Sequence, residues 1–222
     1  MISKIKYKGL YALFFFILYG ICAKAQEKTS WQFEFLPGVS WAAPMPLKIV
    51  QENQPNIQLL AFYDTYPLDL PIYYSYRLSR YKNNRGWEIE LNHLKLVLSN
   101  KPDEIQRFNI THGYNLIWIN RTWNFEGFVF RAGVGTVAAH PENTVRNKNL
   151  DEKQGLFNDG YYISAISAQL AMQKKFILHK YFHLSLEAKI CGGYSKIPVV
   201  DGYAQVPALT GGLHAGLGVK FN

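Results

Sequence analysis

The segment 107–137 constrains the fold of this chain more than any other. From 107 to 115, polar residues such as Arg107 and Asn109 alternate with Phe108 and other apolar or aromatic residues. A turn-like Asn-Phe-Glu-Gly sequence at 124–127 follows, and the alternation then resumes through Arg131. A period of two predicts two antiparallel strands joined as a hairpin. Long strands with one apolar face and one arginine-bearing face are unusual in soluble proteins, but they are expected in membrane barrels.

Residues 1–25 have the features of a secretory signal peptide. Lys4, Lys6 and Lys8 precede an apolar run at 10–21, and an Ala-Lys-Ala cleavage pattern follows at 23–25. An uncleaved N-terminal anchor is the alternative, but the run is short of the about 20 residues that a spanning helix needs. We therefore expect a cleaved signal at 1–25 and a single domain at 26–222.

Composition and motif content argue against several classes of function. Without the signal, Cys191 is the only cysteine, so no disulfide can form within the chain. The net charge is +8, but the chain has no helical basic stripe or lysine tract, and we expect no nucleic-acid partner. Spacings such as His-Glu-x-x-His and Cys-x-x-Cys are absent, so no cofactor and no metal are predicted. The basic surface suits acidic lipid headgroups or lipopolysaccharide phosphates.

The rest of the chain repeats the order strand, turn, strand. Eight strands are predicted, at 31–40, 72–81, 87–98, on either side of the 124–127 turn, and at 160–173, 181–194 and 210–222. Their connections alternate between long and short, with long polar or proline-containing segments at 42–70, 99–106, 140–158 and 195–207. Within the first of these, 57–63 is expected to form the top of a strand or a short lid. Short turns on one side and longer loops on the other are typical of outer-membrane barrels.

One strand changes its pattern midway. At 87–91 the odd positions, Trp87, Ile89 and Leu91, are apolar, whereas Leu94 and the leucines after it occupy even positions. One extra residue in a strand moves the following side chains to the opposite face. The pattern therefore predicts a β-bulge at Asn92-His93, which would place His93 on the polar face.

These strands resemble a known family. The signal ending in Ala25-Gln26, the aromatic-rich two-faced strands and the terminal Phe221-Asn222 are similar to the small eight-stranded outer-membrane β-barrels of Gram-negative bacteria, in particular Bacteroidota-like ones. The resemblance implies an all-β, antiparallel, up-and-down transmembrane barrel with a polar lumen. It also implies an outer-membrane location and contacts with membrane lipid, lipopolysaccharide and the barrel-assembly machinery.

The charged residues of the strands decide which face is inside. A charge on the lipid face near the bilayer midplane would cost about 2–4 kcal/mol, so in a membrane these side chains must line the lumen. An eight-stranded barrel is about wide enough to be filled by side chains. We therefore predict that acids and bases pair into a network that plugs the lumen. The predicted members are Glu34, Arg77, Glu88, Glu90, Arg107, Arg121, Arg131, Glu187, Lys189 and His214.

Two groups of residues are candidates for chemistry at the outer rim. His140, Glu142 and Asp201 fall in the predicted long loops, where a histidine with an acid partner could act as a general base. His93 and His112 lie nearly opposite each other across a predicted hairpin and could form a metal or proton-relay pair if both turned inward. His112 falls among apolar residues by strict alternation, and this position has no structural explanation.

We therefore predict a non-enzymatic outer-membrane barrel with a plugged lumen and external loops that contact the cell surface or a partner. The first alternative is a hydrolase or acyltransferase that modifies lipid A or a phospholipid at the outer rim. The second is a periplasmic lipocalin-like barrel, whose apolar face would point inward and hold a lipid.

Overall fold

The structure, a computed structural model, describes residues 29–156 and 158–221. The predicted signal peptide at 1–25 lies outside the described residues. Within these ranges all regular structure is β-strand, and no helix is long and apolar enough to cross a membrane.

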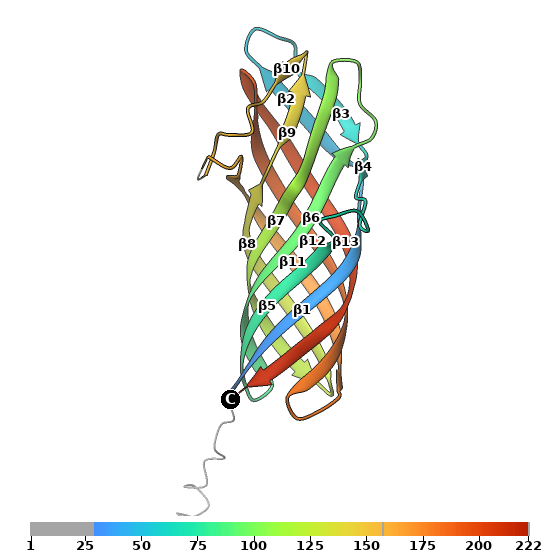
Figure 1. Ribbon diagram of the computed structural model, residues 1–222, viewed down its shortest axis with the longest axis vertical. Coiled ribbons are helices and arrows are strands. Elements are labelled where there is room, and N and C mark those ends of the chain that lie inside the picture. The colour runs from blue at the N-terminus through green and yellow to red at the C-terminus, as the bar shows by residue number, and fades with distance from the viewer. Residues whose placement is uncertain (1–28, 157, 222) are drawn as a thin grey trace, which may run out of the picture.

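Eight long strands close into a barrel (Figure 1). They are β1 (Thr29–Ala42), β5 (Tyr73–Lys82), β6 (Arg85–Leu98), β7 (Ile105–Phe125), β8 (Phe128–Ala139), β11 (Tyr162–Ile177), β12 (Phe182–Val199) and β13 (Gly202–Phe221). Each is antiparallel to the next in this order, and β13 returns to β1 with Trp31 opposite Phe221. The predicted all-β, eight-stranded, up-and-down antiparallel barrel is confirmed.

One end of the barrel is finished by tight turns. Asn83 in the β5–β6 turn has a φ of 56°, and Glu126 and Gly127 in the β7–β8 turn have φ values of 50° and 80°. Residues in left-handed conformations match the twist of the flanking strands in short hairpins. The first residues of β1 and the end of β13 lie at this same end of the barrel (Figure 1).

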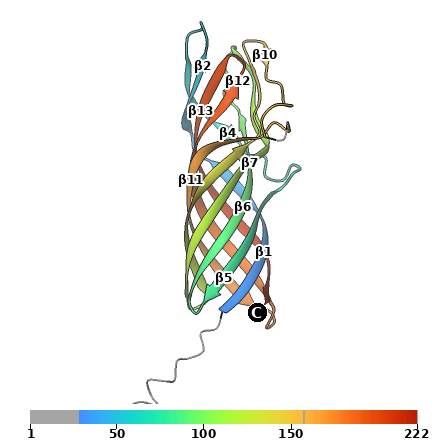
Figure 2. The ribbon, with the colours of Figure 1, turned by 90° about the vertical axis from the view of Figure 1, so that its left-hand side faces the viewer.

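At the opposite end the sheet continues beyond the barrel (Figure 1). Five short strands, β2 (Met45–Gln51), β3 (Ile57–Ala61), β4 (Tyr63–Asp64), β9 (Glu142–Val145) and β10 (Lys148–Asn149), extend the sheet there (Figures 1 and 2). β2 pairs with β13, β3 pairs with β2, and β9 pairs with β7. We call this part of the molecule the upper extension, and the end with the tight turns the lower end.

The predicted loop at 195–207 is wrong. β12 and β13 remain paired as far as Val199 and Gly202, so only a tight turn at 200–201 connects them. The segment 57–63, expected to be the top of a strand or a short lid, is largely strand and contributes to β3 and β4 of the upper extension. Both segments lie above the ring of outward-facing apolar side chains that surrounds the barrel, which we call the apolar belt. Above this belt the strands no longer alternate between an apolar outer face and a polar inner face, so the sequence pattern there is mixed.

The apolar faces of the strands point outward. On β1, Trp31, Phe33 and Phe35 are exposed, whereas Glu34 between them is completely buried. The same alternation runs along β12, where Leu186 and Ile190 are exposed and Glu187 is buried. A lipocalin-like barrel would have the reverse arrangement, with its apolar side chains inside.

The polarity of the side chains that line the interior changes along the barrel axis. Its lower half is lined by charged and amide side chains, and its upper half by a hydrophobic core that includes Leu94, Leu96, Phe108, Ile110 and Trp118. This change explains the altered pattern of β6 without a bulge at Asn92-His93, and the predicted bulge is wrong. The register of β6 is continuous from Arg85 to Leu94, so Asn92 and Leu94 both point inward. His93 therefore points outward and stacks on Tyr74, with the ring centroids 5.1 Å apart.

The irregularity lies instead in β7. Leu94 pairs with Tyr114 and Leu96 pairs with Ile110, so β7 carries extra residues at 111–113. Gly113 has a φ of 143° within this bulge. Because of this bulge, the His112 side chain does not follow the regular alternation of inward and outward side chains along β7.

Candidate functional site

Arg77 lies at the centre of the lower lumen. Its guanidinium nitrogens lie 3.1 Å from Glu34 Oε2, 3.1 Å from Glu90 Oε1 and 2.8 Å from Glu187 Oε2. These four side chains have an exposed fraction of 0%. One arginine on β5 therefore joins carboxylates from β1, β6 and β12 across the interior of the barrel.

A second arginine and a lysine form further ion pairs with the carboxylates of the lower lumen. Arg131 Nε lies 2.9 Å from Glu88 Oε2, and the same guanidinium also donates to Glu187. Lys189 Nζ lies 3.0 Å from Glu187 Oε1 and also donates to Glu90. Each of these carboxylates thus faces at least one cationic partner.

The charges in the lower lumen balance. Lys175 Nζ lies 3.8 Å from Glu34 Oε1, so Arg77, Arg131, Lys175 and Lys189 face the carboxylates of Glu34, Glu88, Glu90 and Glu187. Amides satisfy remaining carboxylate oxygens, with Gln173 Nε2 donating to Glu34 over 2.6 Å and Asn120 Nδ2 to Glu90 over 2.8 Å. Ionic groups in a low dielectric are tolerated when they are paired and hydrogen-bonded in this way. We call these eight charged side chains the lumen network.

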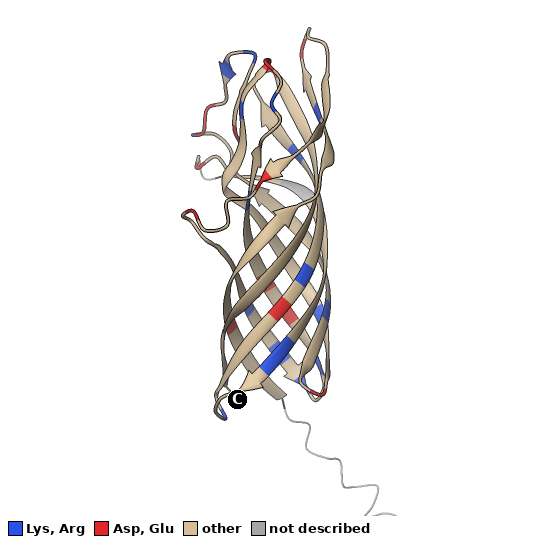
Figure 3. Cartoon of the chain, turned by 90° about the vertical axis from the view of Figure 1, so that its right-hand side faces the viewer, with Lys and Arg blue, Asp and Glu red and all other residues tan. Residues whose placement is uncertain are grey.

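The structure places most of the predicted lumen residues in or beside this network. His214 is buried in the lumen, and an added Cβ on Gly38 would lie 2.4 Å from its ring. Lys175 was missed, because it was assigned to a short link rather than to a strand. Figure 3 shows charged positions in the lower half of the barrel wall and again in the segments at the top.

Arg107 and Arg121 are corrections to the predicted lumen set. Arg121 lies on the outward face of β7, 5.1 Å above the centroid of the Trp87 ring, and donates to the carbonyl of Gly86 over 3.2 Å. Its position near the lower end lets a long cationic side chain reach out of the apolar belt. Arg107 lies in the upper extension, where it contacts Glu142 and Glu152.

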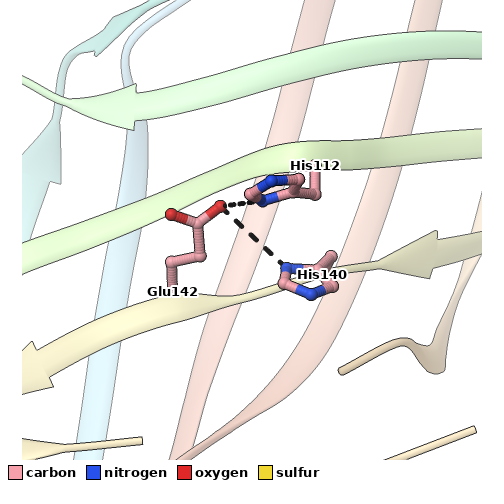
Figure 4. Close-up of side chains that lie close together, drawn as sticks. All are labelled: His112, His140 and Glu142. Atoms are coloured by element: carbon pink, nitrogen blue, oxygen red, sulfur yellow. Dashed lines mark hydrogen bonds and ion pairs between the residues drawn. The ribbon is translucent and has the colours of Figure 1, made fainter. Parts of the chain in front are cut away.

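The rim of the barrel holds a second cluster, formed by His112, His140 and Glu142 (Figure 4). His112 belongs to the β7 bulge, His140 follows the last residue of β8, and Glu142 begins β9. Glu142 Oε1 lies 2.6 Å from His112 Nδ1 and 4.0 Å from His140 Nδ1. The two imidazole rings lie 4.9 Å apart between centroids. We call these three residues the rim cluster.

Local backbone features hold the rim cluster in place. The amide of His140 donates to the carbonyl of Gly113 over 3.0 Å, which ties the end of β8 to the β7 bulge. Gly160 has a φ of 72°, and an added Cβ there would lie 2.5 Å from His140 Nε2. The Tyr161 hydroxyl donates to the carbonyl of His112 over 2.9 Å, and its ring packs edge-on against His140.

The two histidines have different environments. The His112 side chain is 64% exposed, whereas His140 and Glu142 are buried. Burial lowers the pKa of His140, and the neighbouring His112 lowers that pKa further. His140 Nδ1 is buried and forms no hydrogen bond within the described residues. An imidazole with an unpartnered nitrogen therefore faces the Glu142 carboxylate.

The residues of the two predicted rim sites are grouped differently in the structure, where His112 lies with His140 and Glu142. His140 Nδ1 lies 4.0 Å from Glu142 Oε1, whereas Asp201 lies in the β12–β13 turn and pairs with Lys148 of β10. The condition set for a pair of His93 and His112, that both rings turn inward, is not met, since His93 points outward and its Nδ1 lies 2.8 Å from Asn115 Oδ1. The signal for the actual arrangement was the unexplained position of His112 among apolar residues.

Two serines near the rim bond to groups outside the rim cluster. The hydroxyl of Ser99 donates to the carbonyl of Phe62 over 2.9 Å, and that of Ser195 to the Tyr114 hydroxyl over 3.1 Å. The nearest hydroxyl with a described bond to the cluster is that of Thr111, which donates to Glu142. Two imidazole nitrogens and one carboxylate oxygen within 4.8 Å of one another are suited to holding a cation.

No protein-family model matches the chain, and no curated protein matches its sequence. Among solved structures, the chain is similar to the outer membrane protein AlkL in lipid bilayers, with 9% identity, a TM-score of 0.48, and coverage of 90% of this chain and 93% of that one. It is also similar to Neisserial surface protein A, with 11% identity, a TM-score of 0.40, and coverage of 87% and 97%. For the attachment invasion locus protein of Yersinia pestis, the identity is 9%, the TM-score 0.38, and the coverage 88% and 99%.

Proposed function

We propose that this protein is a non-enzymatic barrel that spans the outer membrane of a Gram-negative bacterium, with its lumen plugged and its upper extension outside the cell. The observation that carries the proposal is the inverted polarity of the lower barrel. Charged side chains such as Glu34 and Arg77 are buried there, and large apolar side chains are exposed around the outside. In water this arrangement would leave a wide apolar belt without a partner, and in a bilayer lipid covers it.

The dimensions of the apolar belt suit a bilayer. On β1 the outward residues between Trp31 and Trp41 are apolar, a length close to the about 9–11 residues that a tilted spanning strand needs. At the lower border, Arg80 lies 5.9 Å above the Trp31 ring and Arg121 lies 5.1 Å above the Trp87 ring. Aromatic rings with cationic neighbours are typical of the membrane interface.

The lumen network and the core above it support a closed barrel. Arg77 and the four carboxylates around it have no exposed surface, so water reaches them from neither end. Above them Trp118 is completely buried and begins the hydrophobic core of the upper extension. A polar plug under an apolar core, both built from described residues, supports a lumen that is closed to a continuous aqueous path. We therefore expect planar-bilayer recordings of the purified protein to show no large steady conductance, and such a conductance would contradict the plug.

The proposal assigns the tight turns to the periplasm and the upper extension to the cell surface. This orientation follows the usual asymmetry of outer-membrane barrels, with short periplasmic turns and longer external segments. The upper extension exposes basic side chains, among them Lys148, which can contact lipopolysaccharide phosphates or a partner at the surface.

Cysteine labelling in intact cells tests both the span and its orientation. The native Cys191 is buried, so a membrane-impermeant maleimide will report only introduced cysteines. Gln54→Cys in the β2–β3 turn is expected to react in intact cells. Glu126→Cys in the β7–β8 turn is expected to react only after the outer membrane is permeabilised. Equal labelling of both variants in intact cells would overturn the span, and the reverse pattern would overturn the orientation.

A further inference from the structure

We propose that His112, His140 and Glu142 form a binding site for a divalent transition-metal ion of the Zn²⁺ class at the outer rim. Metal binding goes beyond the membrane-spanning role, since a plugged barrel needs no metal to cross the bilayer. Each residue offers one ligand atom, an imidazole nitrogen or a carboxylate oxygen, and the three atoms lie within 4.8 Å of one another. The Nδ1 atoms of His112 and His140 both face Glu142 Oε1.

The spacing of these atoms fits one ion after small side-chain movements. Zn²⁺ binds imidazole nitrogen and carboxylate oxygen at about 2.0–2.2 Å, so tetrahedral ligands lie roughly 3.3 Å apart. The observed separations from Glu142 Oε1 are 2.6 Å to His112 and 4.0 Å to His140, on either side of that value. Because His112 is largely exposed, its ring can turn without disturbing the core.

The burial of His140 and Glu142 points to a ligand. His140 Nδ1 is buried without a hydrogen bond, although a buried polar atom normally has a partner. Its Nε2 faces the backbone at Gly160, where even a Cβ would not fit, so the ring is fixed with Nδ1 toward Glu142. An ion between the two side chains would satisfy Nδ1 at no cost in packing.

Neighbouring side chains orient the carboxylate as an outer coordination shell would. Arg107 donates to Glu142 Oε2 and Thr111 donates to Oε1. Ligating carboxylates are commonly fixed by such hydrogen bonds, which set the rotamer. Oε1 accepts the Thr111 hydrogen bond with one lone pair, and its second lone pair can bind the metal. The charge of Arg107 is partly offset by Glu152, whose Oε1 lies 3.4 Å from Arg107 Nη1.

The donor set selects the class of ion. Two imidazoles with one carboxylate favour Zn²⁺ and its neighbours Ni²⁺ and Cu²⁺, whereas Ca²⁺ and Mg²⁺ prefer a shell made of oxygen ligands. Three protein ligands leave a further position for water or an external group, on the side where His112 is exposed.

The test is a calorimetric titration of the chelator-treated, tag-free barrel in detergent with Zn²⁺, and in parallel with Ca²⁺. The wild-type protein is expected to bind one Zn²⁺ per chain with micromolar or tighter affinity and to show no comparable Ca²⁺ binding. His112→Ala and Glu142→Gln are each expected to weaken Zn²⁺ binding by about tenfold or more. The matched control is His179→Ala, which changes an exposed histidine in the β11–β12 turn at the lower end and should bind like the wild type.

Heat-modifiable migration of every variant on a gel shows whether the barrel has folded. His112 is exposed and Glu142→Gln keeps the shape of the side chain, so both variants should fold. Absence of Zn²⁺ binding by the folded wild type would overturn the proposal. Unchanged affinity in folded His112→Ala and Glu142→Gln, or a loss of affinity in His179→Ala alone, would also overturn it. Co²⁺ bound to the wild type should show the visible absorption of a low-symmetry site, and His112→Ala should lose it.

Discussion

Arg77 Nη2 lies 2.8 Å from Glu187 Oε2, and this contact joins β5 to β12 through the interior of the barrel rather than along its wall. The two residues are separated in the ring by β1 and β13. Backbone hydrogen bonds hold neighbouring strands, but they cannot hold strands that lie across the lumen. The lumen network therefore supplies the cross-links that fix the shape of the lower barrel.

Removing one charge from the lumen network should be costly. Glu187→Gln leaves Arg77, Arg131 and Lys189 with one fewer carboxylate in a buried site. Breaking a buried ionic pair by removing one partner typically costs about 3–5 kcal/mol. We expect the free energy of unfolding, measured by denaturant titration in vesicles, to fall by that amount. In the control Glu52→Gln, at an exposed position in the upper extension, a change within about 0.5 kcal/mol is expected. A similar small change in Glu187→Gln would show that the network does not stabilise the barrel.

A charged residue introduced in the apolar belt should destabilise the folded protein in a bilayer, whereas one introduced on the surface of the upper extension should not. Leu170 is 67% exposed on β11 within the belt, and Leu60 is 53% exposed on β3 above it. Leu170→Arg should make folding into a bilayer less favourable by about 2–4 kcal/mol, because it places a charge against lipid. Leu60→Arg changes the same residue type at similar exposure, but it faces water and should be nearly neutral. Equal effects of the two substitutions on folding into vesicles would place Leu170 in water.

The core of the upper extension should be separable from the barrel wall. Phe108 of β7 is completely buried in the core of the upper extension. Phe108→Ala would leave a cavity there, and such a substitution typically costs about 3–5 kcal/mol. We expect faster amide hydrogen exchange in β9 and the upper part of β7, with unchanged protection in the lower strands. Phe62→Ala, at an exposed aromatic residue of the same region, serves as the control. Uniform loss of protection in Phe108→Ala would mean that the two halves of the interior unfold together.

The sequence was sufficient to predict the barrel itself. A period of two needs no knowledge of distant contacts, and the turn chemistry at Glu126-Gly127 identifies the hairpin directly. The inward direction of Glu34, Arg77 and Glu187 also follows from local alternation combined with the cost of charge in lipid. These features depend only on residues that are close in the chain.

The sequence was not sufficient where the surroundings of a strand change along its length. Leu94 and Asn92 share the inner face, but one lies in the apolar core and the other in the polar lumen, so polarity alone suggested a bulge. Arg121 was assigned inward because it is charged, although an arginine at the edge of the belt can reach water from the outer face. The rim cluster depends on a bulge in β7 and on the path of the chain after β8, which bring His112 to His140. No spacing in the sequence encodes that contact.

Gly160 should control the position of His140. Its φ of 72° and the 2.5 Å distance from an added Cβ to His140 Nε2 would both oppose Gly160→Ala. The left-handed backbone alone costs about 1 kcal/mol for alanine. Gly127→Ala, with a φ of 80° and its nearest contact at 3.5 Å, carries the same backbone penalty without touching a histidine, and it is the matched control. Chemical modification of His140 by diethyl pyrocarbonate, read by mass spectrometry, should become faster in Gly160→Ala and stay unchanged in Gly127→Ala. If His140 reacted at the wild-type rate in both variants, the turn at 159–160 could not be what holds the imidazole against Glu142.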